Sequence, residues 1–211
     1  MGIALKKVSL QSFFHPTQPT WYNSDMTTLF QIVAETVWYF LPALIANIAP
    51  VIAAAYNWLP ALNSPLDRGI TWKAKPLLGP HKTVRGVVVA VIFGSITGLL
   101  QYLAARSGWA PQQMFIAYDS VNFALVWGAL LGCGAMLGDA LKSFFKRRLN
   151  IPPGEMWAPW DQLDSVIGVL LVTQWFAPLP VTHIISALII IGCAMVGTSM
   201  LGVKLGMKKS L

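Results

Sequence analysis

Long apolar runs alternate along the chain with short polar segments. A helix that crosses a bilayer needs about 20 mostly apolar residues, and four runs fit this requirement: Thr36–Leu59, Gly86–Ala104, Val121–Gly138 and Val181–Leu201. A fifth run, Ser165–Phe176, is long enough only if its helix begins in the polar stretch around Asp161–Asp164. The pattern predicts an all-α integral membrane protein with about five transmembrane helices.

The beginning of the chain differs from the rest. Residues 1–28 mix polar and apolar positions and lack the apolar core and small-residue cleavage site of a signal peptide. We therefore expect residues 1–28 to be an interfacial or mobile N-terminal extension, and residues 29–211 to form one transmembrane domain.

The composition excludes an ordinary soluble domain. Charged residues make up 11% of the 211 residues and hydrophobic residues 55%, with a mean hydropathy of +0.60. A soluble domain has about 25% charged residues. The two cysteines, Cys133 and Cys193, lie far apart within apolar runs, so we expect no disulfide framework.

Basic residues are unevenly distributed between the predicted loops. Of the fifteen, all but Lys6, Lys7 and Arg106 lie after the first span, after the third span or in the C-terminal tail. By the positive-inside rule these three segments face the cytoplasm. We therefore expect a cell-membrane protein with its N-terminus outside and its C-terminus in the cytoplasm.

Small residues recur four positions apart within the predicted spans. The pairs are Gly94 and Gly98, Gly128 and Gly132, and Gly134 and Gly138. In lipid, such spacing lets helix backbones approach closely. The pattern predicts helix packing within the chain or between chains, and so allows a homodimer through these faces.

Two polar segments on the cytoplasmic side carry the candidate chemistry, and the first is Leu78–Gly86. Lys82 and Arg85 lie three residues apart at the start of a predicted helix and share a face. Two cations beside the free N–H groups of a helix start attract phosphate. The alternative, which spacing alone slightly favours, is that they only hold the loop on the cytoplasmic side. The three histidines are scattered, although His81 adjoins this motif.

The second segment begins where the third apolar span ends. Asp139 follows a wholly apolar stretch, where a carboxylate is costly unless it is paired or metal-bound. If the helix continues, Lys142, Ser143 and Lys146 lie on the same face at the third, fourth and seventh positions after Asp139.

Asp161 and Asp164 complete this segment, because on a helix they point the same way. Three carboxylates and up to six cations would then meet in one cytoplasmic pocket. Cations alone would suit lipid headgroups, and carboxylates alone a transported cation or a proton relay. Both together match a nucleoside triphosphate with Mg²⁺. No Walker-type glycine loop is present, which excludes a P-loop enzyme.

At these residues the sequence resembles the CDP-archaeol synthases, membrane enzymes related to the phosphatidate cytidylyltransferases. Three motifs carry the resemblance: Lys82-Thr83-x-Arg85-Gly86, Gly138-Asp139-x-x-Lys142-Ser143-Phe144-x-Lys146-Arg147-Arg148, and Asp161-Gln162-x-Asp164. Asn47 with Pro50 in the first span and the terminal Gly202–Lys209 segment also look similar. Phosphatidate cytidylyltransferases usually carry an acidic residue in place of Lys142, so the match is closer to the archaeal branch.

The resemblance implies transfer of CMP from CTP to a membrane lipid phosphate, with release of pyrophosphate, for phospholipid biosynthesis. The lipid would be 2,3-bis-O-geranylgeranylglycerol phosphate or a phosphatidate-like lipid, and residues 29–211 would form the cytidylyltransferase domain. The implied partners are CTP, the lipid phosphate and membrane lipids, with no nucleic acid.

The resemblance also implies roles for the motif residues. Asp161 and Asp164 would hold the cofactor Mg²⁺, with Asp139 on a second metal ion or on a neighbouring lysine, and Lys146 would join Asp161 and Asp164 as a catalytic residue. The implied substrate-binding residues are Asn47, Lys82, Thr83, Arg85, Lys142, Ser143, Arg147, Arg148 and Gln162.

Two alternatives stay open. A CTP-dependent polyprenol or phytol kinase shares the style of these motifs, but its hydroxyl acceptor would need a base. An anion or lipid transporter would need polar positions at mid-membrane in both halves of the chain, whereas the ionisable residues here collect on one side.

Overall fold

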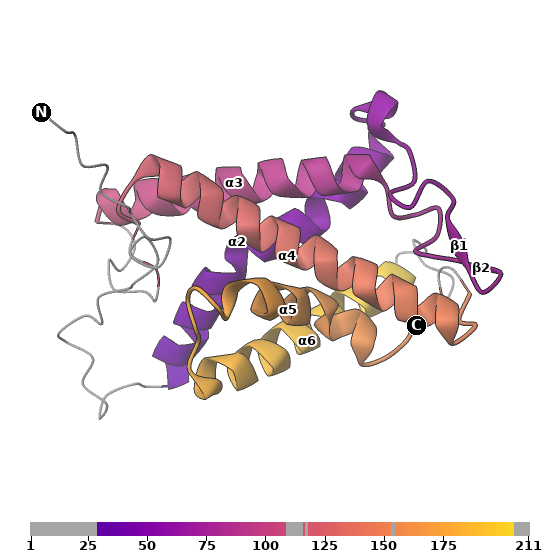
Figure 1. Ribbon diagram of the computed structural model, residues 1–211. Helices are drawn as coiled ribbons and strands as arrows, with labels where there is room; N and C mark the ends of the chain where they lie inside the picture. The colour runs from indigo at the N-terminus through magenta and orange to yellow at the C-terminus, as the bar shows by residue number, and fades with distance from the viewer. Residues whose placement is uncertain (1–28, 109–115, 117, 153–154, 205–211) are drawn as a thin grey trace, which may run out of the picture.

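The computed structural model describes residues 29–108, 116, 118–152 and 155–204. These residues form five α-helices: α2 (Leu29–Ala55), α3 (Val84–Arg106), α4 (Val121–Arg148), α5 (Trp160–Thr173) and α6 (Val181–Lys204) (Figure 1). The expected N-terminal extension, residues 1–28, and the end of the C-terminal motif lie outside the described residues.

Three of these helices are long and apolar enough to cross a membrane, namely α2, α3 and α4. Helix α6 has 24 residues and includes the apolar stretch Val181–Gly197, whereas α5 has only 14 residues. The helical fold is as predicted, and the fourth and fifth crossings stay predictions.

Local signals account for where the helices begin and end. The Thr83 and Ser120 side chains cap α3 and α4 by accepting hydrogen bonds from Gly86 N–H and Phe123 N–H, each at 3.2 Å. Helix α2 ends at Ala55, before the predicted Leu59, because Asn57 and Leu59 have left-handed backbone angles with φ near 49°.

The connection between α2 and α3 contains a short 3-10 helix, η1 (Pro60–Leu62), and a hairpin of two-residue strands, β1 (Thr71–Trp72) and β2 (Lys75–Pro76). The hairpin departs slightly from the expected all-α fold. Its turn residues Lys73 and Ala74 both have positive φ, as a type I′ turn requires. Neither is the glycine or asparagine that usually marks such a turn, so the sequence pattern does not reveal it.

The small-residue faces pack helices of this one chain together. A Cβ atom added to Gly94 of α3 would lie 2.4 Å from the carbonyl oxygen of Gly128 of α4, closer than atoms can approach. Gly138 of α4 packs in the same way on α5. These faces are therefore buried inside the bundle, which confirms the predicted packing within the chain, and a homodimer stays a prediction.

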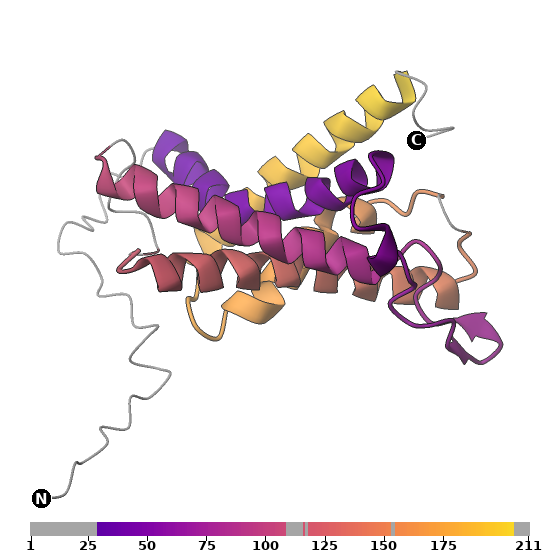
Figure 2. The ribbon, with the colours of Figure 1, turned by 90° about the horizontal axis from the view of Figure 1, so that it is seen from above.

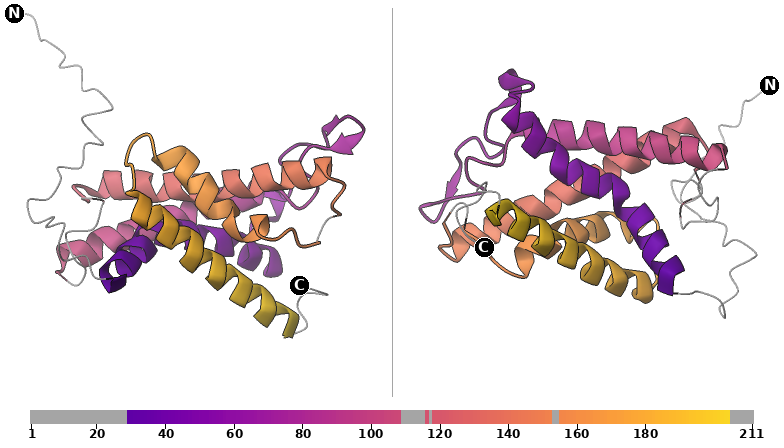
Figure 3. Two further views of the ribbon diagram at one scale, coloured as in Figure 1. Left: turned by 90° about the horizontal axis from the view of Figure 1, so that it is seen from below. Right: turned by 180° about the vertical axis from the view of Figure 1, so that it is seen from behind.

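Consecutive helices run in opposite directions (Figures 1 and 2). As a result, the C-terminal ends of α2, α4 and α6 gather at one end of the bundle with the N-terminal ends of α3 and α5. This end also carries the hairpin, and we call it the basic end because most of the described lysines and arginines lie there. Towards it, α6 leans away from the other helices (Figures 2 and 3).

The core lies between α2, α4, α5 and α6, where Phe40, Trp127 and Leu131 are almost fully buried. At the end opposite the basic end, a buried polar contact links α2 and α6. His183 Nε2 lies 2.9 Å from Glu35 Oε2, and both side chains are withdrawn from the surface.

Candidate active site

A cavity of about 1220 Å³ lies at the basic end of the bundle. All five helices and the α2–α3 connection contribute to its wall. One part of the wall is apolar, with Pro50, Val51 and Met195, and the other is charged. The residues predicted to share a pocket therefore border one cavity in large part, and this cavity offers both an apolar and a highly polar surface to a ligand.

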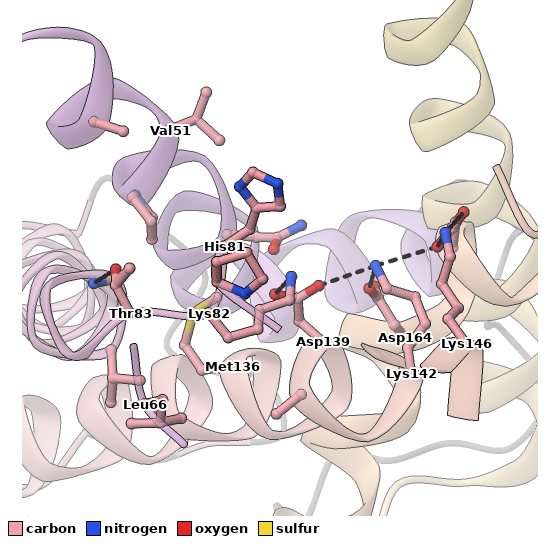
Figure 4. Close-up of a pocket in the computed structure, with 18 of the residues that line it drawn as sticks. Val51, Leu66, His81, Lys82, Thr83, Met136, Asp139, Lys142, Lys146 and Asp164 are labelled. Carbon is pink, nitrogen blue, oxygen red and sulfur yellow. Dashed lines mark hydrogen bonds and ion pairs between the residues drawn. The ribbon is translucent and has the colours of Figure 1, made fainter. Parts of the chain in front are cut away.

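Lys142 lies at the centre of the charged wall (Figure 4). Its Nζ atom is 2.9 Å from Asp139 Oδ1, 2.6 Å from Asp164 Oδ2 and 3.3 Å from Asp161 Oδ1. One ammonium group thus contacts all three carboxylates that the sequence predicted to meet.

Two further lysines flank this centre. Lys82 Nζ lies 2.5 Å from Asp139 Oδ2, and Lys146 Nζ lies 3.0 Å from Asp161 Oδ2 and also donates to the Glu155 carbonyl oxygen. The three lysines and three carboxylates therefore form one network of alternating charge. Their side chains are 4–24% exposed, so the network lies at the boundary between protein and solvent.

The helices hold this network together. Helix α4 continues past Asp139 to Arg148, which meets the condition set from the sequence, and so places Asp139, Lys142 and Lys146 along one face. Asp161 lies in the first turn of α5 and accepts a hydrogen bond of 2.5 Å from Trp157 N–H. A carboxylate at a helix N-terminus also interacts favourably with the helix dipole.

The α2–α3 connection positions Lys82 at the cavity wall. Leu66 N–H donates to the Lys82 carbonyl oxygen at 2.6 Å, and Val84 N–H donates to the Ser64 carbonyl oxygen at 3.0 Å. These backbone contacts fix the Lys82 backbone just before α3 begins.

Asp67 organises the same connection and was not found from the sequence. Its carboxylate accepts hydrogen bonds from the N–H groups of Leu78 (2.8 Å), Gly79 (3.1 Å) and Gly69 (3.0 Å). Burial raises the pKa of the Asp67 carboxyl, but these N–H donors outweigh burial and hold the pKa below its usual value. Asp67-Arg68-Gly69 has the spacing of an Asx turn, which was the available signal.

Three other predicted residues line the cavity. Arg85 and Asn47 both line it, and the Arg85 guanidinium also lies 3.4 Å from Asn57 Oδ1 and 3.3 Å from the Trp58 carbonyl oxygen. Thr83 lines it too, although its hydroxyl is the cap of α3.

Four predicted substrate-binding residues do not line the cavity: Ser143, Arg147, Arg148 and Gln162. Ser143 Oγ donates to the Asp139 carbonyl oxygen at 2.8 Å, and Gln162 Nε2 lies 3.6 Å from Met156 Sδ. Each is thus directed at its own helix or at a neighbouring loop.

Arg148 is directed at the hairpin. Its guanidinium donates to the Trp72 carbonyl oxygen at 2.7 Å and lies 5.0 Å from the centre of the Phe144 ring. The physical reason is helical rotation, because Arg147 and Arg148 follow Lys146 by about 100° and 200° around α4. The structure therefore gives Arg148 a role in holding the β1–β2 hairpin.

Sequence reasoning also missed residues of the cavity wall. They include Met136, Met195, Met156 and Glu155, together with His81, which was noted only as a neighbour of the basic motif. The methionines lie in different segments of the chain, so no local pattern links them.

The donor chemistry of the site fits Mg²⁺, because three carboxylates offer hard oxygen ligands around one point. In this structure the Lys142 ammonium group occupies the point between the three carboxylates. Consistent with this, no set of three His, Cys, Asp or Glu side chains in the described ranges is arranged to hold a metal ion.

The sequence is similar to a known protein family and to several of its members. A family model described as CarS-like, CDP-archaeol synthase, matches residues 29–211. The chain is 31% identical to a CDP-archaeol synthase of Pyrococcus furiosus over 177 residues, which are 83% of this chain and 96% of that protein. It is 36% identical to a CDP-archaeol synthase of Methanospirillum hungatei over 155 residues, 69% of this chain and 87% of that protein.

A solved structure also matches. It is described as an intramembrane enzyme for archaeal membrane lipid biosynthesis, with a TM-score of 0.64 and 27% identity, covering 80% of this chain and 94% of that one. The family model, the relatives and the solved fold agree with the resemblance that the charged motifs carry. The chain therefore belongs to the CDP-archaeol synthase family.

Proposed function

We propose that this protein transfers CMP from CTP to a membrane lipid phosphate and forms a CDP-activated lipid. The observation that carries the proposal is the network of three carboxylates and three lysines in one cavity of a chain that belongs to the CDP-archaeol synthase family. The lipid is 2,3-bis-O-geranylgeranylglycerol phosphate or a closely similar phosphate. The product serves phospholipid biosynthesis.

In this reaction an oxygen of the lipid phosphate forms a bond to the α-phosphorus of CTP. The bond from that phosphorus to the bridging oxygen of the β-phosphate breaks, and pyrophosphate leaves with its electron pair. The lipid phosphate is already an anion, so the reaction needs no strong base. The work of the protein is to bring two polyanions together and to stabilise the charge on the transferred and departing groups.

The residues of the cavity suit that work. Lys82, Arg85 and Lys146 supply positive charge to phosphate oxygens, and the apolar wall with Val51 and Met195 suits the lipid next to its phosphate. Arg85 supplies a planar fork of donors, which matches two phosphate oxygens at once.

Asp161 and Asp164 would hold Mg²⁺, with Asp139 contributing from α4. When bound, the ion neutralises phosphate oxygens that the lysines do not reach. The support for this assignment is the convergence of three carboxylate oxygens on one point.

For the membrane arrangement, we infer five crossings of the cell membrane, with the N-terminus outside and the cavity facing the cytoplasm. The support is that the cavity and most of the described basic residues share one end of the bundle. This end would then face the compartment in which CTP is made.

The kinase and transporter alternatives have less support. A kinase would need a carboxylate free to act as a base, whereas each cavity carboxylate of the network is paired with a lysine. A transporter would need ionisable groups along a path through the bundle, and here the lysine–carboxylate network lies at one end.

The test uses CTP labelled at either end of its triphosphate. Purified protein in lipid nanodiscs is incubated with Mg²⁺ and the lipid phosphate, together with CTP that carries label on the α- or on the γ-phosphate. We expect α-label in a CDP-lipid and γ-label in pyrophosphate. Transfer of the γ-label to a lipid would instead identify a kinase, and no transfer of either label would contradict both.

A further inference from the structure

Lys142 differs from the other two lysines of the network in its contacts. Lys82 contacts only Asp139 among the carboxylates, and Lys146 only Asp161, whereas Lys142 contacts all three. One oxygen from each carboxylate is directed at its Nζ atom, at 2.6–3.3 Å. An ammonium group therefore occupies the point on which three hard ligands converge.

A divalent ion and the Lys142 ammonium cannot share this point. Mg²⁺ binds oxygen at about 2.0–2.1 Å, so an ion held by these carboxylates would overlap the position of Nζ. The lysine could leave, because its ammonium is carried on a flexible four-carbon stem. The Lys142 side chain lines the cavity, so the displaced ammonium group can move into the cavity.

Electrostatics favour a cation at this point whether or not a metal ion is bound. Without Lys142, three largely buried carboxylates would face only Lys82 and Lys146. A carboxylate of low exposure without a partner is costly. The cost would be largest for Asp164. Its side chain is only 4% exposed, and Lys142 is its one basic partner among the described residues.

We propose that Lys142 is a tethered cation that fills the carboxylate site in the metal-free protein and is displaced when the divalent ion binds. Displacement releases its ammonium into the cavity, where phosphate oxygens of the substrates can accept its hydrogen bonds. Metal binding and the release of the Lys142 ammonium into the cavity are thereby coupled. This inference rests on the proposed function, because it takes the three carboxylates as the metal ligands.

The test measures metal binding in the absence of CTP. Mn²⁺ affinity is determined by electron paramagnetic resonance on purified protein in nanodiscs, for the unaltered chain and for Lys142→Met. We expect the variant to bind Mn²⁺ at least tenfold more tightly, because the ion no longer has to displace an ammonium. In EDTA the variant should unfold at a lower temperature than the unaltered protein, and Mn²⁺ should stabilise it more.

Two controls separate displacement from a general change in charge. Lys82→Met removes a lysine that pairs with one of the same carboxylates, and Lys75→Met removes one on the hairpin that donates to the Arg148 carbonyl oxygen. Both should change Mn²⁺ affinity much less than Lys142→Met. Equal effects of Lys82→Met and Lys142→Met would overturn the proposal.

A second measurement does not depend on the folding of a variant. In the unaltered protein, acylation of Lys142 by an amine-reactive reagent is followed by mass spectrometry with and without Mn²⁺. Displacement predicts faster acylation of Lys142 with the metal and no change at Lys75. An unchanged rate at Lys142 while Mn²⁺ is bound would overturn the proposal.

The outcomes distinguish this inference from the proposed function. If Mn²⁺ binds and Asp161→Asn abolishes binding, but Lys142→Met has no effect, only the displacement proposal fails. If neither the unaltered chain nor any variant binds Mn²⁺, the metal assignment fails and the displacement proposal with it. CDP-lipid formation, measured separately, tests the reaction itself.

Discussion

Gly138 of α4 packs directly on the backbone of Asp164 in α5, so that a Cβ atom at position 138 would lie 1.8 Å from the Asp164 carbonyl oxygen. Gly138 precedes Asp139 in the chain, and Asp164 is the partner of Lys142. The contact therefore sets the distance between the two halves of the carboxylate cluster.

We expect Gly138→Ala to reduce both stability and CDP-lipid formation. The new methyl group meets backbone atoms, which cannot rotate away, and overpacking of this kind costs about 1–3 kcal/mol. Denaturant unfolding in detergent measures the loss. Gly197→Ala is the matched control, because a Cβ atom there meets nothing within 4 Å. Equal stability of the two variants would contradict the expected close contact.

Asp161→Asn and Asp164→Asn should each abolish product formation in a folded protein. Each change removes a charge from the proposed metal ligands, and losing one electrostatic contact to the transition state costs on the order of 100-fold in rate or more. Activity should also vanish in EDTA and return with Mg²⁺. Glu155→Gln is the control, since Glu155 borders the cavity with an exposed side chain. Full turnover in excess chelator would remove the metal role.

Arg85→Lys and Arg148→Lys should separate a substrate contact from a structural one. Arg85 lines the cavity, so loss of its planar fork should cost about 1–3 kcal/mol in kcat/KM, by the scale of charge-assisted hydrogen bonds. Arg148 holds the hairpin, so Arg148→Lys should mainly lower the unfolding temperature. Kinetics with both variants in the same membranes, alongside thermal unfolding, provide the measurement. The reverse pattern would return Arg148 to the substrate-binding set.

Asp67→Asn should weaken the α2–α3 connection in a pH-dependent way. The folded pKa of Asp67 lies below its unfolded value, so its contribution to stability is present above the unfolded pKa and is lost as pH falls through the folded pKa. At neutral pH we expect a loss of roughly 1–3 kcal/mol, because a charged acceptor of three N–H groups is removed.

The difference between Asp67→Asn and the unaltered protein should therefore shrink as the pH is lowered towards 3. Thermal unfolding at a series of pH values measures this difference. Asp119→Asn, at an exposed carboxyl near the other end of the bundle, is the control for loss of one negative charge.

Membrane orientation can be tested with single cysteines in a chain whose Cys133 and Cys193 are replaced by alanine. Ser107 follows α3, Leu149 follows α4, and both are exposed. An impermeant thiol reagent added to intact cells should label Ser107→Cys and leave Leu149→Cys unlabelled until the cells are opened. The opposite labelling would place the cavity outside the cell.

Hydropathy and periodicity predicted the helical framework because both signals are local. The apolar runs mark the helices, and the spacing of Asp139, Lys142 and Lys146 is enough to place them on one face once α4 continues to Arg148. The family resemblance rested on the same charged motifs, and the comparisons confirm it.

The remaining details depend on contacts between distant segments. Asp67 takes its role from N–H groups two, eleven and twelve residues further along the chain. Arg148 belongs to the basic motif in sequence but is directed at the hairpin, whose turn carries no sequence signal. Spacing also could not reveal that Lys142, of the three lysines, contacts every carboxylate.

The buried contact between His183 and Glu35 has a mechanical consequence for the cavity. It fixes α6 to α2 at the end of the bundle opposite the basic end, while α6 leans away towards Met195, on the cavity wall. At 1.5 Å per residue, Met195 is about 18 Å along α6 from His183, so tilting the helix by about 5° moves that wall by roughly 1.5 Å. The buried polar contact therefore anchors α6 at one end, and the position of the Met195 wall depends on the angle at which the helix leaves that anchor.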